Sequence, residues 1–264
     1  MESLNLNKPD ALIRYLDFPG TKAPIVFLHG LGCASTFDYP IIAADPHLVG
    51  HRKLLPDLLG HGYSDAPKDF SYTIAEHART VAQLLDHLAI KGAIMYGHSM
   101  GGSVAVMLTV ARPDLVSRLL LSEANLDPGG GFLSSGVAEQ GERDFVERGH
   151  SAVVDRFANK PTRLATFRGA DSIGFHRSAV SLVAGTQPPW REQFYALQIP
   201  KAWIVGDQSE PEADIAQMKP QGIPVFVIAD AGHDMAIENP AGVAAAIAQG
   251  LSIAPSEAEP TSAA

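Results

Sequence analysis

Cysteine is almost absent from this chain, and so are dense clusters of basic residues. The one cysteine, Cys33, excludes an intramolecular disulfide and the paired-cysteine spacing of many metal sites. Acidic residues outnumber basic ones by 29 to 20, which gives a formal net charge of -9. A charge balance of this sign disfavours nucleic acid and anionic membrane surfaces as partners.

Long apolar runs are also missing. No segment of the sequence approaches the length of a membrane-spanning helix, and the first residues lack the basic flank and apolar core of a signal peptide. We therefore expect a soluble, cytoplasmic protein. Its 264 residues, 46% of them hydrophobic, suffice for one large core with a smaller inserted unit.

Short apolar runs and helical patterns alternate along the chain. The runs have the length and continuity of strands that are buried on both faces. They lie at residues 25–28, 93–96, 119–121, 202–205 and 225–228. Apolar residues at helical spacing lie between two of these runs, in residues 74–88, and after the last run, in residues 243–251. This alternation predicts an α/β fold with a mostly parallel sheet wrapped by helices.

The alternation stops in residues 125–199, where a Pro-Gly-Gly-Gly turn is followed by polar, arginine-rich and aromatic sequence. We interpret this segment as an inserted, mainly helical cap on a core made of residues 1–124 and 200–253. Its large apolar residues are expected mostly to pack the cap onto itself and the core. They are Phe132, Phe145, Phe157, Phe175, Trp190 and Phe194. Residues 254–264 have too little apolar content to fold and are expected to be disordered.

Residues 97–102 read Gly-His-Ser-Met-Gly-Gly and directly follow an apolar run. A strand that turns into a helix within one residue leaves room only for small neighbours, here Gly97 and Gly101. Such a nucleophile elbow would hold the hydroxyl of Ser99 above the sheet. Because Gly-x-Ser-x-Gly also arises by chance, the elbow interpretation depends on the strand before it and the helix after it.

A serine hydroxyl needs a base within hydrogen-bond reach, and the base needs a third group that orients it. His233 is the candidate base, since it lies between the last apolar run and the final helix. For the acid we favour Glu123, which directly follows the run at 119–121, with Asp207 and Glu210 as alternatives. Neighbouring strands lie about 4.8 Å apart, so a carboxylate at either strand end is able to serve the same histidine. Asp127 and Asp230 are more distant possibilities, and Asp234 is expected to point elsewhere.

The oxyanion of a tetrahedral intermediate needs two convergent backbone N–H groups. The elbow supplies one from Met100. The sequence His-Gly-Leu-Gly at residues 29–32 allows close backbone approach after the first apolar run, and it makes Leu31 the candidate second donor.

These motifs together resemble the α/β-hydrolase fold superfamily. The resemblance covers nearly the whole chain and includes residues 29–32, residues 57–64, the Ser99 elbow and the terminal His233. In that superfamily the acid most often falls where this chain has Ser209, so an acid at Glu123 would be a minority arrangement. Asp57 and His61 match positions whose role in the superfamily is usually structural.

The resemblance and the site residues predict a serine hydrolase that cleaves a carboxylic ester or lactone through an acyl-serine intermediate. No metal or organic cofactor is expected, and the partner is a small-molecule substrate. The same triad also serves carbon–carbon bond hydrolysis and cofactor-free haloperoxidase-like chemistry. Some proteins of this fold are small-molecule receptors that retain the triad. The sequence leaves these alternatives and the oligomeric state open.

Overall fold

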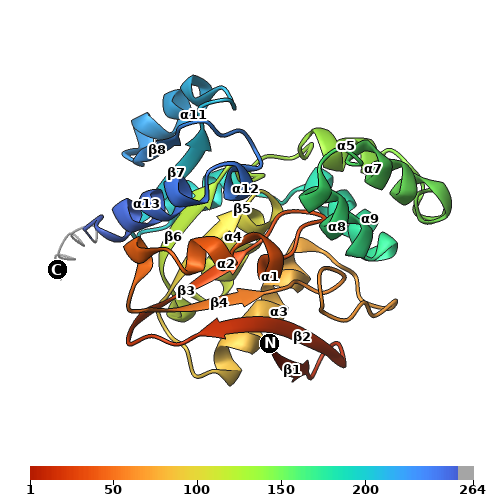
Figure 1. Cartoon of the computed structure of the whole chain (residues 1–264), viewed down its shortest axis with the longest axis horizontal. Helices are drawn as coiled ribbons and strands as arrows, with labels where there is room; N and C mark the ends of the chain where they lie inside the picture. Colours follow the sequence, from red (N-terminus) through yellow and green to blue (C-terminus); the bar gives the residue numbers. More distant parts are fainter. Residues whose placement is uncertain (255–264) are drawn as a thin grey trace, which may run out of the picture.

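The computed structural model describes residues 1–254, and an eight-stranded sheet forms its centre (Figure 1). The strand order is β1-β2-β4-β3-β5-β6-β7-β8, with β1 and β2 antiparallel to their neighbours and the other pairs parallel. The strands are β1 Glu2–Leu6, β2 Ala11–Phe18, β3 Lys22–Leu28, β4 His51–Pro56, β5 Ala93–His98, β6 Val116–Ser122, β7 Lys201–Gly206 and β8 Val225–Ile228. The predicted mostly parallel α/β sheet is confirmed.

The central strands are buried on both faces. Along β5, Ala93 and Met95 belong to one apolar cluster, and Ile94 and Tyr96 belong to another on the opposite side. Successive side chains of a strand point to opposite faces, so a strand covered on both sides must be apolar throughout. This explains why the central strands appear in the sequence as unbroken apolar runs.

Helices cover the two faces of the sheet. The cluster on one face includes side chains of α3 Ile74–His87 and α4 Met100–Ala111, and α13 Pro240–Leu251 packs on the other. Shorter helices accompany them at α1 Ser35–Asp38, α2 Pro40–Ala43, α11 Pro211–Met218 and α12 Met235–Glu238. The side chain of Thr73 accepts a hydrogen bond from the Glu76 N–H, which caps the start of α3.

Six α-helices fill the segment between β6 and β7. They are α5 Phe132–Ala138, α6 Glu142–Asp144, α7 His150–Arg156, α8 Pro161–Gly169, α9 Ser172–Ala184 and α10 Trp190–Ala196. In Figure 1, α5, α7, α8 and α9 gather in a group of their own beside the sheet. We propose that this segment acts as the cap expected for residues 125–199. Residues 255–264 of the expected disordered tail lie outside the described residues.

Strands β1, β2 and β4 are not among the apolar runs found in the sequence. Residues of β2 alternate between buried and partly exposed for most of its length. Such a strand lacks the continuous apolar run that marked the central strands. Within residues 1–254, no helix is long and apolar enough to cross a membrane.

Three buried histidines lie next to one another, one directly after β3, one after β4 and one on α3. The ring centroids of His29 and His61 are 5.1 Å apart, and those of His61 and His77 are 6.3 Å apart. His77 Nε2 also lies 3.0 Å from the hydroxyl oxygen of Ser178 on α9. Burial lowers the pKa of each of the three imidazoles to about 3, because the protonated form would lose its hydration.

These histidines make the fold sensitive to acid. Each imidazole has a lower pKa in the folded than in the unfolded chain. Its contribution to the free energy of unfolding is therefore fully present above about pH 6.5 and is lost as the pH falls toward about 3. We expect His77→Gln to reduce the slope of unfolding free energy against pH by about 1.4 kcal/mol per pH unit between about pH 4 and 6. Urea denaturation across this range measures the slope.

The matched control is His87→Gln, which removes an exposed histidine from the end of the same helix. This exchange removes no buried imidazole, so the slope of unfolding free energy against pH should stay at the wild-type value. An unchanged slope in His77→Gln would show that the buried imidazole does not resist protonation.

Candidate active site

Ser99 occupies a strained turn between β5 and α4. Its backbone has φ 52° and ψ -120°, a conformation that a residue with a side chain rarely adopts. A Cβ atom on Gly101 would lie 2.2 Å from the carbonyl oxygen of Leu28, and one on Gly97 would lie 2.7 Å from the Gly101 oxygen. Side chains at these two positions are thus excluded, and the strand can turn into the helix within one residue.

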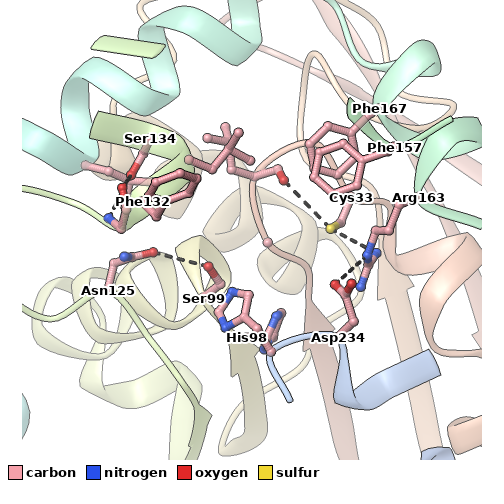
Figure 2. Close-up of a pocket in the computed structure, with 16 residues that line it drawn as sticks. Cys33, His98, Ser99, Asn125, Phe132, Ser134, Phe157, Arg163, Phe167 and Asp234 are labelled. Atoms are coloured by element: carbon pink, nitrogen blue, oxygen red, sulfur yellow. Dashed lines mark hydrogen bonds and ion pairs between the residues drawn. The ribbon is translucent and has the colours of Figure 1, made fainter. Parts of the chain in front are cut away.

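The hydroxyl of Ser99 points into a cavity and donates a hydrogen bond to Asn125 Oδ1 at 3.2 Å. Asn125 lies just after β6, in the loop that leads to the helical segment. Figure 2 shows the two side chains together on one side of the cavity. Asn125 was not identified from the sequence, because a single asparagine in a loop carries no pattern.

His233 and Glu123 form a hydrogen-bonded pair next to this turn. His233 Nδ1 lies 2.6 Å from Glu123 Oε2, and the N–H of Gly206 donates to Glu123 Oε1 at 3.0 Å. Burial acts to raise the pKa of the Glu123 carboxyl, but hydrogen bonds from His233 and from the Gly206 N–H lower it below its usual range. The ionised carboxylate therefore favours a proton on Nδ1 and leaves Nε2 as the atom able to accept one.

His98, the residue before Ser99, packs against His233. The two ring centroids are 4.6 Å apart, and His98 Nδ1 lies 3.0 Å from the hydroxyl oxygen of Ser122. Burial holds the pKa of His98 well below its usual range, so this imidazole stays neutral. A neutral neighbour does not oppose a positive charge on His233.

The two alternative acids lie elsewhere. The carboxylate of Asp207 accepts hydrogen bonds from the N–H groups of Asp230 and Ala231, at 3.0 and 3.1 Å. It therefore holds the turn that precedes His233. Glu210 directly precedes α11 in a left-handed conformation. Of the three candidate carboxylates, the structure brings Glu123 to the histidine.

The candidate oxyanion residues lie on two sides of Ser99. Met100 is the first residue of α4, where backbone N–H groups have no acceptor within the helix. Leu31 lines the cavity, and a Cβ atom on the preceding Gly30 would lie 3.3 Å from Ser99 Cβ. His29 Nε2 accepts a hydrogen bond from the Leu58 N–H at 3.0 Å, which fixes the start of this turn.

The cavity above Ser99 has a volume of about 450 Å³ and is mainly apolar. Its apolar wall comes from the turn after β3 and from the helical segment. The wall consists of Leu31, Cys33, Phe132, Leu133, Phe157, Phe167 and Leu182. The other large apolar residues noted in the sequence are buried away from it, namely Phe145, Phe175, Trp190 and Phe194.

Arg163 is a second site residue that the sequence did not reveal. It lies on α8, lines the cavity and makes ion pairs with Asp38 and Asp234. Asp234 points away from His233 toward this arginine, as expected. Within residues 1–254, no group of three or more His, Cys, Asp or Glu side chains is placed to hold a metal ion.

The model of the family described as alpha/beta hydrolase fold matches residues 23–173. With the elbow and the sheet topology described above, the chain belongs to this family. A relative from Cupriavidus necator, the dihydrolipoyllysine-residue acetyltransferase component of an acetoin cleaving system, is 30% identical over 243 residues. The match covers 84% of this chain and 61% of that relative, so the chain spans less than two thirds of it.

Solved structures of the same fold include two enzymes with ester-type names. A thermophilic esterase from Thermogutta terrifontis has a TM-score of 0.78 and 25% identity, with 95% of this chain and 97% of that chain covered. An enol-lactonase from Burkholderia xenovorans has a TM-score of 0.78 and 22% identity, with 96% and 100% covered. The second similarity shows the fold alone.

The contacts of Glu123 and Asp207 predict a ranking of their variants. In Glu123→Gln the amide cannot hold the proton on Nδ1 as a carboxylate does, so His233 becomes a weaker base. We expect labelling of Ser99 by a fluorophosphonate to slow on the order of 10⁴-fold, the loss in kcat when the carboxylate of a serine protease triad is replaced by an amide.

Asp207→Asn is the matched control, since it removes a carboxylate whose hydrogen bonds go to the turn before His233. We expect it to slow labelling by less than about tenfold, because the amide oxygen still accepts from a backbone N–H. The opposite ranking of the two variants would move the acid from Glu123 to Asp207.

Proposed function

We propose that this protein hydrolyses a carboxylic ester or a lactone through an acyl-serine intermediate. The observation that carries the proposal is the position of Ser99 at the elbow, facing an apolar cavity, beside a histidine held 2.6 Å from Glu123. Nucleophile, base and acid thus come from the ends of β5, β8 and β6. They meet at the carboxyl edge of the sheet, where ligands of open α/β folds bind.

In the first half of the reaction, Ser99 Oγ attacks the substrate carbonyl. The hydroxyl leaves its hydrogen bond with Asn125 and gives its proton to Nε2 of His233. Glu123 stabilises the imidazolium that forms, through its contact with Nδ1. The backbone N–H groups of Leu31 and Met100 bind the oxyanion of the tetrahedral intermediate.

His233 then gives the proton to the leaving alkoxide, and the acyl group stays on Ser99. In the second half, His233 takes a proton from water, which attacks the acyl carbon. The second tetrahedral intermediate collapses with return of that proton to Ser99 Oγ, and the carboxylic acid leaves. Each proton transfer uses side chains described above.

The cavity favours a medium-sized substrate that is largely apolar. Aromatic and aliphatic side chains form most of its wall, and pockets of this type gain affinity by removing apolar surface from water. The choice of an ester bond is supported by the esterase from Thermogutta terrifontis, which has the same fold over nearly its full length. The Cupriavidus relative carries the name of an acyltransferase component, so acyl chemistry is common to both names.

The test is a time course with activated esters and lactones of short and medium chain length. Wild type should release many equivalents of product per molecule. Ser99→Ala should lose activity by about 10⁴-fold or more, since it removes the nucleophile, while its circular dichroism stays unchanged.

Ser135→Ala, on α5, removes a half-buried serine that does not line the cavity, and it serves as the control. It should keep wild-type turnover. If fluorophosphonate labels Ser99 but no ester or lactone turns over, the proposal is wrong. Such a result would favour carbon–carbon bond hydrolysis, haloperoxidase-like chemistry or a receptor role.

A further inference from the structure

Arg163 is a buried arginine whose contacts come from three parts of the chain. It lies on α8, and its side chain is 4% exposed. Nε donates to Asp234 Oδ1 at 2.7 Å, and Nη1 donates to both carboxylate oxygens of Asp38 at 3.0 Å. Nη1 also lies 3.1 Å from the sulfur of Cys33. These contacts fix the plane of the guanidinium group.

The second terminal nitrogen, Nη2, has no protein acceptor among residues 1–254. A guanidinium has five N–H donors, and the two on Nη2 remain for a ligand in the cavity that Arg163 lines. Figure 2 places Arg163 with Cys33 and Asp234 on the side of the cavity opposite Ser99 and Asn125. Arg163 therefore lies across the cavity from Ser99.

The charge of Arg163 is already balanced within the protein. Asp38 is buried with 2% of its side chain exposed, and Asp234 lies on the other edge of the guanidinium. Lys160 contacts Asp234 from the exposed side, at 3.4 Å. Two carboxylates thus face two cations, and the buried thiol of Cys33 adds no charge because burial raises its pKa.

This balance selects the chemistry of the ligand. A carboxylate at Nη2 would bring a third negative charge into a mainly apolar cavity beside two carboxylates, at a cost in repulsion and desolvation. A carbonyl or hydroxyl oxygen would accept the free N–H without that cost. A purely apolar group would leave a charged donor without a partner.

We propose that Nη2 of Arg163 is a subsite for an uncharged hydrogen-bond acceptor on the acyl part of the substrate, away from the scissile carbonyl. The inference rests on the proposed esterase or lactonase function and narrows it. The substrate is an ester or lactone of an oxygenated acyl chain, with a ketone, hydroxyl or amide oxygen seated against the arginine. Neither simple fatty esters nor acyl groups with a free carboxylate match this subsite.

The test uses p-nitrophenyl esters that share one leaving group and one chain length. They are the octanoate, three analogues with a ketone at the third, fifth or seventh carbon, and the octanedioate half ester with a terminal carboxylate. For wild type, kcat/KM should be at least about tenfold higher for one ketone ester than for octanoate. The half ester should be at least about tenfold poorer than octanoate.

Arg163→Lys keeps a positive charge beside Asp38 and removes the planar fork that presents Nη2. It should bring the ratio between the preferred ketone ester and octanoate close to one. Arg168→Lys is the matched control, since it makes the same exchange at an exposed arginine of α8 that does not line the cavity. Its ratio should equal that of wild type. If Arg163→Lys does not fold, the kcat/KM ratios of the wild-type protein between the ketone esters and octanoate test the subsite.

The outcomes separate this inference from the proposed function. If octanoate turns over through Ser99 and every ketone ratio is near one, the subsite is wrong and the esterase proposal stands. A higher kcat/KM for the half ester than for octanoate would also overturn the proposed subsite and would indicate an anion site instead. If neither these esters nor the lactones of the first test turn over, the proposed function fails. In that case calorimetry measures the binding of the esters to Ser99→Ala. Binding of one ketone ester about tenfold tighter than octanoate supports the subsite, and equal binding overturns it.

Discussion

The backbone turn at Ser99 is the constraint on which the rest of the site depends. The backbone of Ser99, with φ 52°, is strained. This conformation persists because β5 and α4 pack tightly around it, which the lack of side chains at Gly97 and Gly101 permits. Because the turn lies at the carboxyl edge of a parallel sheet, the loops after β3, β6 and β8 converge on it. Position in the sheet, more than local sequence, brings Glu123 and His233 together.

Much of the fold and part of the site could be predicted from local patterns. The central strands appear as apolar runs because they are covered on both faces, and the elbow has a fixed spacing because only glycine fits beside Ser99. Strand β2 escaped prediction because its residues alternate in burial. Glu123 rather than Asp207 contacts His233, although β7, which precedes Asp207, lies next to β8, because the Asp207 carboxylate is held by the N–H groups of Asp230 and Ala231. The sequence placed both carboxylates at strand ends and could not decide between them.

Asn125 and Arg163 could not have been found in the sequence. Each acts through contacts with residues far along the chain: Asn125 with Ser99, and Arg163 with Asp38 and Asp234. The contact of Asn125 requires β6 to lie beside β5, and the contacts of Arg163 require the helical segment to lie against the core. The helical segment supplies most of the apolar wall, so in the proposed reaction the core provides the reacting groups and the inserted helices provide the recognition surface.

The most direct test of the account is to observe the acyl-serine itself. Rapid mixing of the enzyme with excess p-nitrophenyl octanoate, followed by acid quenching and peptide mass spectrometry, measures the acyl group on each peptide. We predict a burst of nitrophenolate of about one equivalent or less, with an octanoyl mass on the peptide that contains Ser99. Steady turnover with the octanoyl group on another residue would contradict the account.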